Sequence, residues 1–99
     1  MKEDTLSEWQ ATQLFLSETG VHEVATNLDN AKLRCDCAAF RERNICKHTR
    51  FVTIRRSQNN GVYPVEVSKK ASEHEASLAS LDPKLFRPFL VKYGKIEIV

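Results

Sequence analysis

Three cysteines and one histidine fall within fourteen residues of this chain, and this cluster constrains the fold more than any other feature. The stretch from Cys35 to His48 reads Cys-x-Cys, eight residues, then Cys-x-His. In an extended segment, residues i and i+2 project to the same face, so Cys35 and Cys37 can reach one ion together. Cys46 and His48 supply a second pair at the start of an expected helix, where backbone N–H groups stabilise a thiolate. The sequence therefore predicts a metal site.

The chemistry of these side chains favours zinc. Three cysteines and one histidine make a closed tetrahedral set that is typical of structural zinc, with no position left for water or substrate. The cysteines are odd in number, and a disulfide between Cys35 and Cys37 would close a strained ring. Inert buried thiols are the alternative interpretation. We expect the other two histidines, His22 and His74, to be exposed or to lie on a strand face.

The chain has neither a long apolar run nor the pattern of a secretory signal. Its apolar runs, such as 14–16 and 89–91, are far shorter than the roughly 20 residues needed to cross a bilayer. Residues 1–7 carry charges of both signs, and no apolar stretch ending in small residues follows them. We therefore expect an intracellular protein, cytoplasmic or, in a eukaryote, nuclear, that is not secreted, does not bind membranes and keeps its thiols reduced.

The length of 99 residues predicts a single domain, 1–99, of the α+β class, with a sheet in its N-terminal half. Residues 8–17 fit either a strand or a helix, and we favour a strand. Gly20 marks a turn. Residues 21–26 and 31–37 are expected to form an antiparallel β-hairpin through an Asn/Asp-rich turn, and a preceding strand would extend it to a three-stranded meander.

A helix over residues 46–57 should follow, after a loop or a single helical turn at 38–45. Three apolar residues of this helix are expected to face the core: Phe51, Val52 and Ile54. The segment Asn59-Asn60-Gly61 ends the helix, because Asn and Gly are favoured just past helix ends. Residues 62–67 alternate apolar and polar with a proline inside, which predicts an edge strand.

The C-terminal extension, residues 62–99, should end in a helix and a short closing strand. Residues 68–80 are polar and predict either an exposed helix or a connector. Asp82, followed by a proline, is a strong helix start, and Gly94 ends that helix. Four apolar residues are expected to turn inward: Leu85, Phe86, Phe89 and Leu90. Residues 95–99 alternate and form the closing strand. The whole chain is then a small zinc-stapled α+β domain.

Positive charge is concentrated on the segment that holds the cysteines. The chain has a net charge of +2, but the segment Lys32–Arg56 carries +6 and the remainder −4. Lysine and arginine neutralise phosphates and release counterions, so this segment is a candidate surface for nucleic acid. The candidate contacts are Arg41, Arg43, Lys47, Arg50, Arg55 and Arg56. The plainer interpretation is a solvated helix face that offsets a negative zinc–thiolate centre.

The stretch LRCDCAAFRERNICKHTRFV resembles the SWIM-type zinc finger. It has the Cys-x-Cys and Cys-x-His pairs, an aromatic Phe40 in the linker and an apolar helix after the histidine. The resemblance implies a ββα zinc fold over residues 21–57, with roles in DNA binding and in protein–protein contacts. The zinc ligands it implies are Cys35, Cys37, Cys46 and His48. An iron–sulfur family with a similar donor set has three residues between its last Cys and the His, whereas here only Lys47 intervenes.

These features favour a binding module over an enzyme. We expect the finger to bind DNA through its basic surface, and the alternative is a protein–protein interaction adaptor in which the finger is a structural scaffold. Asp36 and Glu42 are close to the ligands in sequence, but a metal with four protein ligands leaves them no activated water. The sequence also lacks a Gly-rich phosphate loop. We therefore expect no catalytic residues and no small-molecule substrate.

Overall fold

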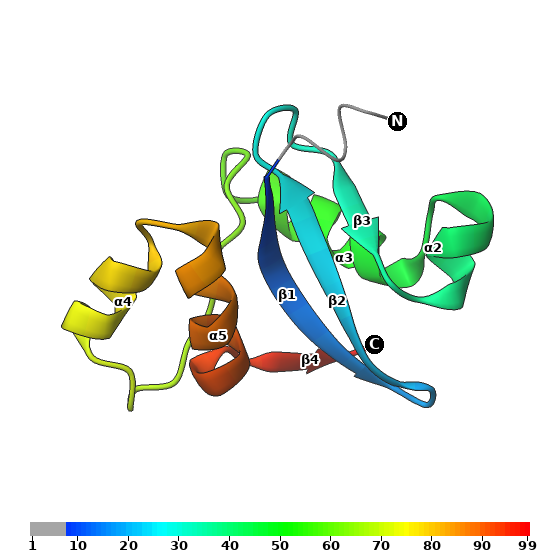
Figure 1. Ribbon diagram of the computed structural model, residues 1–99. Helices are drawn as coiled ribbons and strands as arrows, with labels where there is room; N and C mark the ends of the chain where they lie inside the picture. Colours follow the sequence, from blue (N-terminus) through cyan, green and yellow to red (C-terminus); the bar gives the residue numbers. More distant parts are fainter. Residues whose placement is uncertain (1–7) are drawn as a thin grey trace.

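The fold is a four-stranded mixed sheet with helices on both faces. The computed structural model describes residues 8–99 (Figure 1). The strand order is β3-β2-β1-β4, in which β1, β2 and β3 form an antiparallel meander and β4 pairs in parallel with β1. The elements in chain order are β1 (Trp9–Ser17), β2 (Gly20–Asn27), β3 (Leu33–Cys35), α2 (Ala38–Arg43), α3 (Lys47–Ser57), α4 (Glu73–Ala79), α5 (Pro83–Tyr93) and β4 (Ile96–Ile98). The predicted α+β class and its three-stranded meander are confirmed.

Strand β1 lies inside the sheet and supplies residues to two cores. Phe15 is fully buried with Val24 of β2 and Val52 of α3 in the larger core, which also contains the three cysteines. The neighbouring Leu14 packs with Leu90 of α5 in a second core. Successive residues of a strand point to opposite faces. Helix α3 therefore covers one face of the sheet and α5 the other (Figure 1).

A buried glutamine connects β1 to the C-terminal part of the chain. The register of β1 shifts between Ala11 and Gln13, and residues 11–15 are all buried. The side-chain amide of Gln13 donates to the carbonyl oxygen of Lys95, and its oxygen accepts a hydrogen bond from the Tyr63 hydroxyl at 2.9 Å. A buried polar group without such partners would be costly. Gln13 thus ties β1 to the residue before β4 and to the segment that follows α3.

Local capping signals position the last two helices. Asp82 accepts a hydrogen bond from the backbone N–H of Lys84 at 2.9 Å, and a proline follows it, which confirms the predicted start of α5. Ser72 and Glu75 form a capping box at the start of α4. Of the two alternatives predicted for the polar segment 68–80, an exposed helix or a connector, the helix therefore forms within it. The Tyr93 hydroxyl donates to the Glu75 carboxylate at 2.9 Å. This bond holds α4 against the end of α5.

The edge strand predicted at residues 62–67 is wrong. The segment has no strand, and only Val67 forms an isolated bridge, to Gly94. Pro64 has no N–H to donate to a sheet ladder, and the Tyr63 side chain is engaged with β1 instead. The extended segment predicted at 31–37 also contains a shorter strand than expected, because β3 covers only its middle.

Two apolar residues predicted to face the core are half exposed. Ile54 of α3 and Leu85 of α5 each have 51% of their surface exposed. Each helix packs on the sheet with only part of its apolar surface: Val52 and Leu90 are buried, and Phe51 and Phe86 are partly buried against the same cores. A helix of three turns has room for more apolar residues than such a contact accommodates. The predicted inward position is confirmed for Val52 and Leu90 and is wrong for Ile54 and Leu85.

Within the described residues, no helix is both long enough and apolar enough to cross a membrane. The prediction about a secretory signal concerns residues 1–7, which lie outside the described part of the chain. The boundaries predicted for the finger, 21–57, and for the C-terminal extension, 62–99, stay predictions.

Two leucines of α5 that look alike in the sequence pattern should differ in their contribution to stability. Leu90 is 2% exposed and Leu85 is 51% exposed. Leu90→Ala should lower the free energy of unfolding by about 2–5 kcal/mol, because it removes buried methyl groups and leaves a cavity. Leu85→Ala, the matched control, should change it by no more than about 0.5 kcal/mol. Urea unfolding followed by circular dichroism measures both, and equal losses would contradict this packing of α5.

Candidate metal centre

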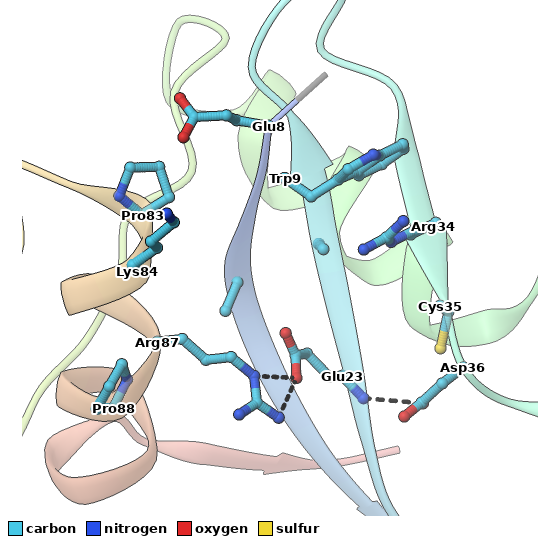
Figure 2. Close-up of a pocket in the computed structure, with 12 residues that line it drawn as sticks. Glu8, Trp9, Glu23, Arg34, Cys35, Asp36, Pro83, Lys84, Arg87 and Pro88 are labelled. Carbon is cyan, nitrogen blue, oxygen red and sulfur yellow. Dashed lines mark hydrogen bonds and ion pairs between the residues drawn. The ribbon is translucent and has the colours of Figure 1, made fainter. Parts of the chain in front are cut away.

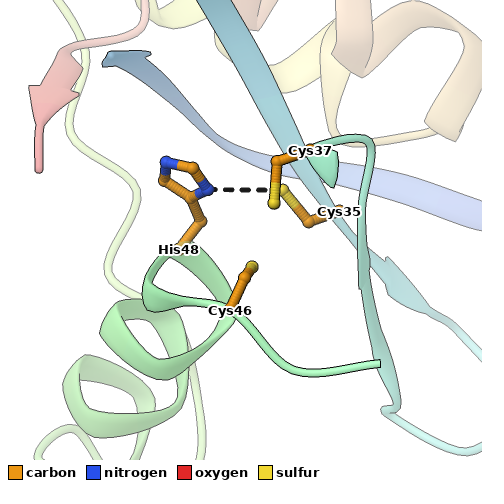
Figure 3. Close-up of side chains that lie close together, drawn as sticks. All are labelled: Cys35, Cys37, Cys46 and His48. Atoms are coloured by element: carbon orange, nitrogen blue, oxygen red, sulfur yellow. Dashed lines mark hydrogen bonds between the residues drawn. The ribbon is translucent and has the colours of Figure 1, made fainter. Parts of the chain in front are cut away.

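Four buried side chains from two chain segments converge on one point (Figure 3). Cys35 is the last residue of β3, and Cys37 is the N-cap of α2. Cys46 is the N-cap of α3, and His48 lies in the first turn of that helix. The four side chains are only 3–7% exposed, and their ligand atoms all lie within 4.8 Å of one another. The group predicted from the sequence is therefore assembled and could hold one metal ion.

The separation of one sulfur and the imidazole nitrogen matches tetrahedral coordination. Zinc binds sulfur at about 2.3 Å and nitrogen at about 2.0–2.1 Å, so at a tetrahedral angle the S···N separation is about 3.6 Å. The distance from Cys35 Sγ to His48 Nδ1 is 3.6 Å. Figure 3 shows this ring nitrogen facing the sulfurs, while Nε2 is buried without a hydrogen-bond partner in the described part of the chain. The residues present fit a tetrahedral ion bound through Nδ1.

The N-terminus of α3 favours the thiolate form of Cys46. The backbone N–H of Thr49 donates to Cys46 Sγ at 3.4 Å, and the Thr49 hydroxyl lies 3.6 Å from the same sulfur. Burial alone would raise the pKa of Cys46, but hydrogen bonds, first those from Thr49 and then those from Cys37 and His48, together outweigh it, and the pKa is lowered. Thr49 is not among the site residues predicted from the sequence. Its signal is the Cys-x-x-Thr spacing of a capping box, in which the Thr49 hydroxyl also accepts from the Cys46 N–H at 3.3 Å.

The other ligands have protonation states set mainly by burial. Burial raises the pKa of Cys35, and the charges of the neighbouring thiols add to this effect. Burial also lowers the pKa of His48, helped by the nearby His22 and Lys47. A neutral imidazole is the form that binds a metal, so His48 is ready to coordinate at neutral pH. Cys35 must lose its proton first, and metal binding therefore releases a proton from this group.

The outer side of the group is tied to the β1–β2 hairpin. The Asp36 carboxylate accepts from the backbone N–H of Glu23 at 3.0 Å and lies 3.2 Å from His22 Nδ1. The other ring nitrogen of His22 lies 2.7 Å from the Thr19 hydroxyl. Asp36 therefore holds the ligand loop against β2. His22 is half-buried on β2 and His74 is exposed on α4, as predicted.

Three of the six predicted basic contacts line one cleft beside the metal centre. This hollow, which we call the finger cleft, has a volume of about 630 Å³ and lies against Cys46 and His48. Its basic lining residues are Arg43, Lys47 and Arg50. None of their side chains forms an ion pair within residues 8–99, although Glu18 also lines the cleft. The structure thus gathers half of the predicted surface in one place.

The remaining three arginines point elsewhere. The Arg41 guanidinium donates to the carbonyl oxygen of Asp36 at 3.1 Å. Arg55, one of the candidate nucleic-acid contacts, is half-buried over the Phe51 ring and pairs with Glu97 at 3.1 Å. Arg56 donates to a backbone carbonyl in the β2–β3 turn and does not line the finger cleft. The six residues therefore do not line a single cleft.

Comparisons with protein-family models, with curated proteins and with solved structures found no match. The Cys-x-Cys and Cys-x-His group is present and buried, and the resemblance to the SWIM-type finger stays a prediction.

Loss of one ligand should unfold the region around the group. Cys37→Ser or His48→Ala removes one of four donors, and a structural metal contributes its binding free energy directly to folding. We expect one equivalent of zinc and cooperative unfolding in the wild type, and loss of both in either variant. Elemental analysis and circular dichroism measure this, with His74→Ala on exposed α4 as the control. Retained folding after strong chelation would contradict the prediction.

The hydroxyl of Thr49 should tune metal affinity. Thr49→Val keeps the shape and the backbone N–H but removes the contacts of the hydroxyl with Cys46. We expect zinc affinity to fall by about 10- to 100-fold, as is typical when an outer partner of a ligand is lost. The matched control is Thr53→Val, one turn along α3, whose hydroxyl donates to a backbone carbonyl. Competition with a chelator measures both affinities, and equal values would refute the role of Thr49.

Proposed function

We propose that this protein is a binding module built around one structural zinc ion. The donor set of three sulfurs and one imidazole nitrogen and the 3.6 Å separation of Cys35 Sγ and His48 Nδ1 support zinc over other metals. A closed shell of four protein ligands has no position for substrate, which supports a binding role over catalysis. Thiols that must stay reduced to bind zinc also support an intracellular location.

We further propose that the module binds nucleic acid, DNA in the first place, through the basic surface around the finger. The observation that carries this proposal is the finger cleft, where Arg43, Lys47 and Arg50 lie together without ion pairs among the described residues. Lysine and arginine side chains in one concave surface create a positive potential that attracts phosphates.

The negative charge of a zinc–thiolate centre offsets only part of this potential. Zinc with three thiolates and one neutral imidazole carries one net negative charge. The finger cleft contains three cationic side chains against that charge and the Glu18 carboxylate. A positive excess remains at the mouth of the cleft, and the wider segment Lys32–Arg56 carries +6. The charge balance therefore supports a phosphate partner.

A protein–protein interaction adaptor is the second candidate, and one observation favours it. The α4–α5 region exposes three leucines: Leu78 at 46%, Leu81 at 77% and Leu85 at 51%. Neighbouring exposed apolar side chains are a common feature of protein-binding surfaces. In this case the finger would act as the scaffold, and the C-terminal helices would contact the partner.

Binding to DNA at increasing salt concentration tests the first candidate. Short labelled duplex and single-stranded DNA are titrated with the zinc-loaded protein and followed by fluorescence anisotropy. We expect binding at low salt that weakens steeply as salt rises, because phosphate contacts release counterions. The double variant Lys47→Gln/Arg50→Gln should weaken binding and reduce the slope of log K against log salt by about 1 for each lost contact.

The matched control removes the same charge from a distant site. Lys69→Gln/Lys70→Gln lies in the exposed turn before α4 and also lowers the net charge by two. If both double variants lose affinity equally, the effect is one of total charge and the finger cleft is not the site. If the wild type binds neither form of DNA at low salt, nucleic-acid binding is refuted and the adaptor becomes the leading candidate.

A further inference from the structure

A second basic hollow, the β3–α3 cleft, lies between β3, α2 and α3. Its volume is about 840 Å³. Its lining includes three basic, two aromatic and one amide side chain: Lys32, Arg34, Arg56, Trp9, Phe40 and Asn44. No acidic side chain of the described residues belongs to this lining. Three cations in a concave surface without a carboxylate favour a polyanionic ligand.

The cations of this cleft keep their charge. The Arg56 guanidinium donates to the carbonyl oxygen of Ala31 at 3.0 Å, a neutral partner that fixes its position without cancelling its charge. Lys32 and Arg34 are exposed to solvent. The finger cleft, by contrast, includes a carboxylate. The β3–α3 cleft is therefore the hollow in which phosphate groups meet no acidic lining residue.

Trp9 and Arg34 line both the β3–α3 cleft and a groove on the α5 face of the sheet, so they form a wall that the two hollows share. Figure 2 shows this wall from the groove side. The guanidinium carbon of Arg34 lies 4.2 Å from the centroid of the indole ring. On the groove side, Glu23 pairs with Arg87 at 2.9 Å, and the Asp36 carboxylate lies next to it (Figure 2). The groove side mixes three carboxylates, those of Glu8, Glu23 and Asp36, with the cations Lys84 and Arg87, whereas the cleft side has no carboxylate among its described lining residues. The cleft side is therefore the more favourable side of the wall for an anionic chain.

We infer that the β3–α3 cleft binds single-stranded nucleic acid, with phosphates near Lys32 and Arg56 and a base stacked on the wall of Trp9 and Arg34. This inference rests on the proposed nucleic-acid binding and deepens it by naming the form of the polymer and a second contact surface. Indole rings and guanidinium groups stack on any base, so the ligand is a single strand of DNA or RNA without sequence preference.

The wall gives a reason to prefer a single strand to a duplex. In a duplex the bases stack on one another, so an aromatic side chain reaches a base face only after unstacking it, which costs a few kcal/mol. A single strand offers its base faces directly, and each stacked base improves affinity by about 5- to 150-fold, judged by alanine substitution. The phosphate contacts alone would not discriminate between the two forms.

Trp9 reports on this wall directly because it is the sole tryptophan of the chain. The zinc-loaded protein is titrated at low salt with oligothymidylate, with oligouridylate and with a duplex of the same length, and tryptophan emission and anisotropy are recorded. We expect both single strands to quench Trp9 and to bind more tightly than the duplex. The affinities for oligouridylate and oligothymidylate should differ only if the cleft contacts the 2′-hydroxyl of the ribose. Trp9→Ala should weaken single-strand binding by about 5- to 150-fold.

Charge variants on the two sides of the wall complete the test. Lys32→Gln, in the cleft, should weaken single-strand binding, whereas Lys84→Gln, on the groove side, is the matched control and should bind as the wild type. Circular dichroism shows whether Trp9→Ala is folded. If it is not, Lys32→Gln and Trp9 quenching in the wild type decide the question.

The outcomes separate this inference from the proposed function. Two results together would overturn the inference and leave the finger cleft as the DNA surface. The first is salt-dependent binding to the duplex that leaves Trp9 emission unchanged, and the second is an affinity of Lys32→Gln for the single strands equal to that of the wild type. No binding to any polymer at low salt would overturn both. Single-strand binding that is lost in Lys32→Gln but kept in Lys47→Gln/Arg50→Gln would support the β3–α3 cleft and exclude the finger cleft.

Discussion

The fold depends on joining two short chain segments at four buried side chains. Strand β3 has three residues and α2 has six, and elements this short do not form without tertiary support. Strand β3 ends at Cys35 and α2 lies between Cys37 and Cys46, so a shared ion would close the loop that contains α2 and fix the end of β3. The cysteines also pack with Phe15 and Val24 in the larger core. A metal bound to them would therefore join the loop to the sheet as well as to α3.

The same closure sets the walls of both basic clefts. Helix α2 contributes Ala38 and Arg43 to the finger cleft, and Phe40 of α2 and its C-cap Asn44 line the β3–α3 cleft, so this short helix borders both hollows. Its position is fixed at the start by Cys37, its N-cap. At its end, the left-handed conformation of Asn44 turns the chain back toward the second ligand pair. The backbone that carries the four candidate metal ligands therefore also sets the shape of both clefts.

Features with local causes could be predicted from the sequence, and features with distant causes could not. The Cys-x-Cys spacing, the positive φ of Gly20 and the Asp82 cap depend on neighbours in sequence, and all were predicted. The parallel pairing of β4 with β1 depends on Gln13 and on residues more than 80 positions apart. The exposure of Ile54 depends on which face of α3 meets the sheet. No periodicity within one element carries that information.

The charges show the same difference between features with local causes and features with distant causes. A count along the chain assigned +6 to one segment but could not tell which charges stay unpaired. Arg55 is neutralised by Glu97 of β4, which the parallel strand brings to the end of α3. Lys47 at the start of α3 lines the finger cleft, and Arg56 near its end lines the β3–α3 cleft. One helix, anchored at its N-terminus by two metal ligands, therefore distributes its charges between two surfaces, and a polymer long enough to contact both would pass over α2.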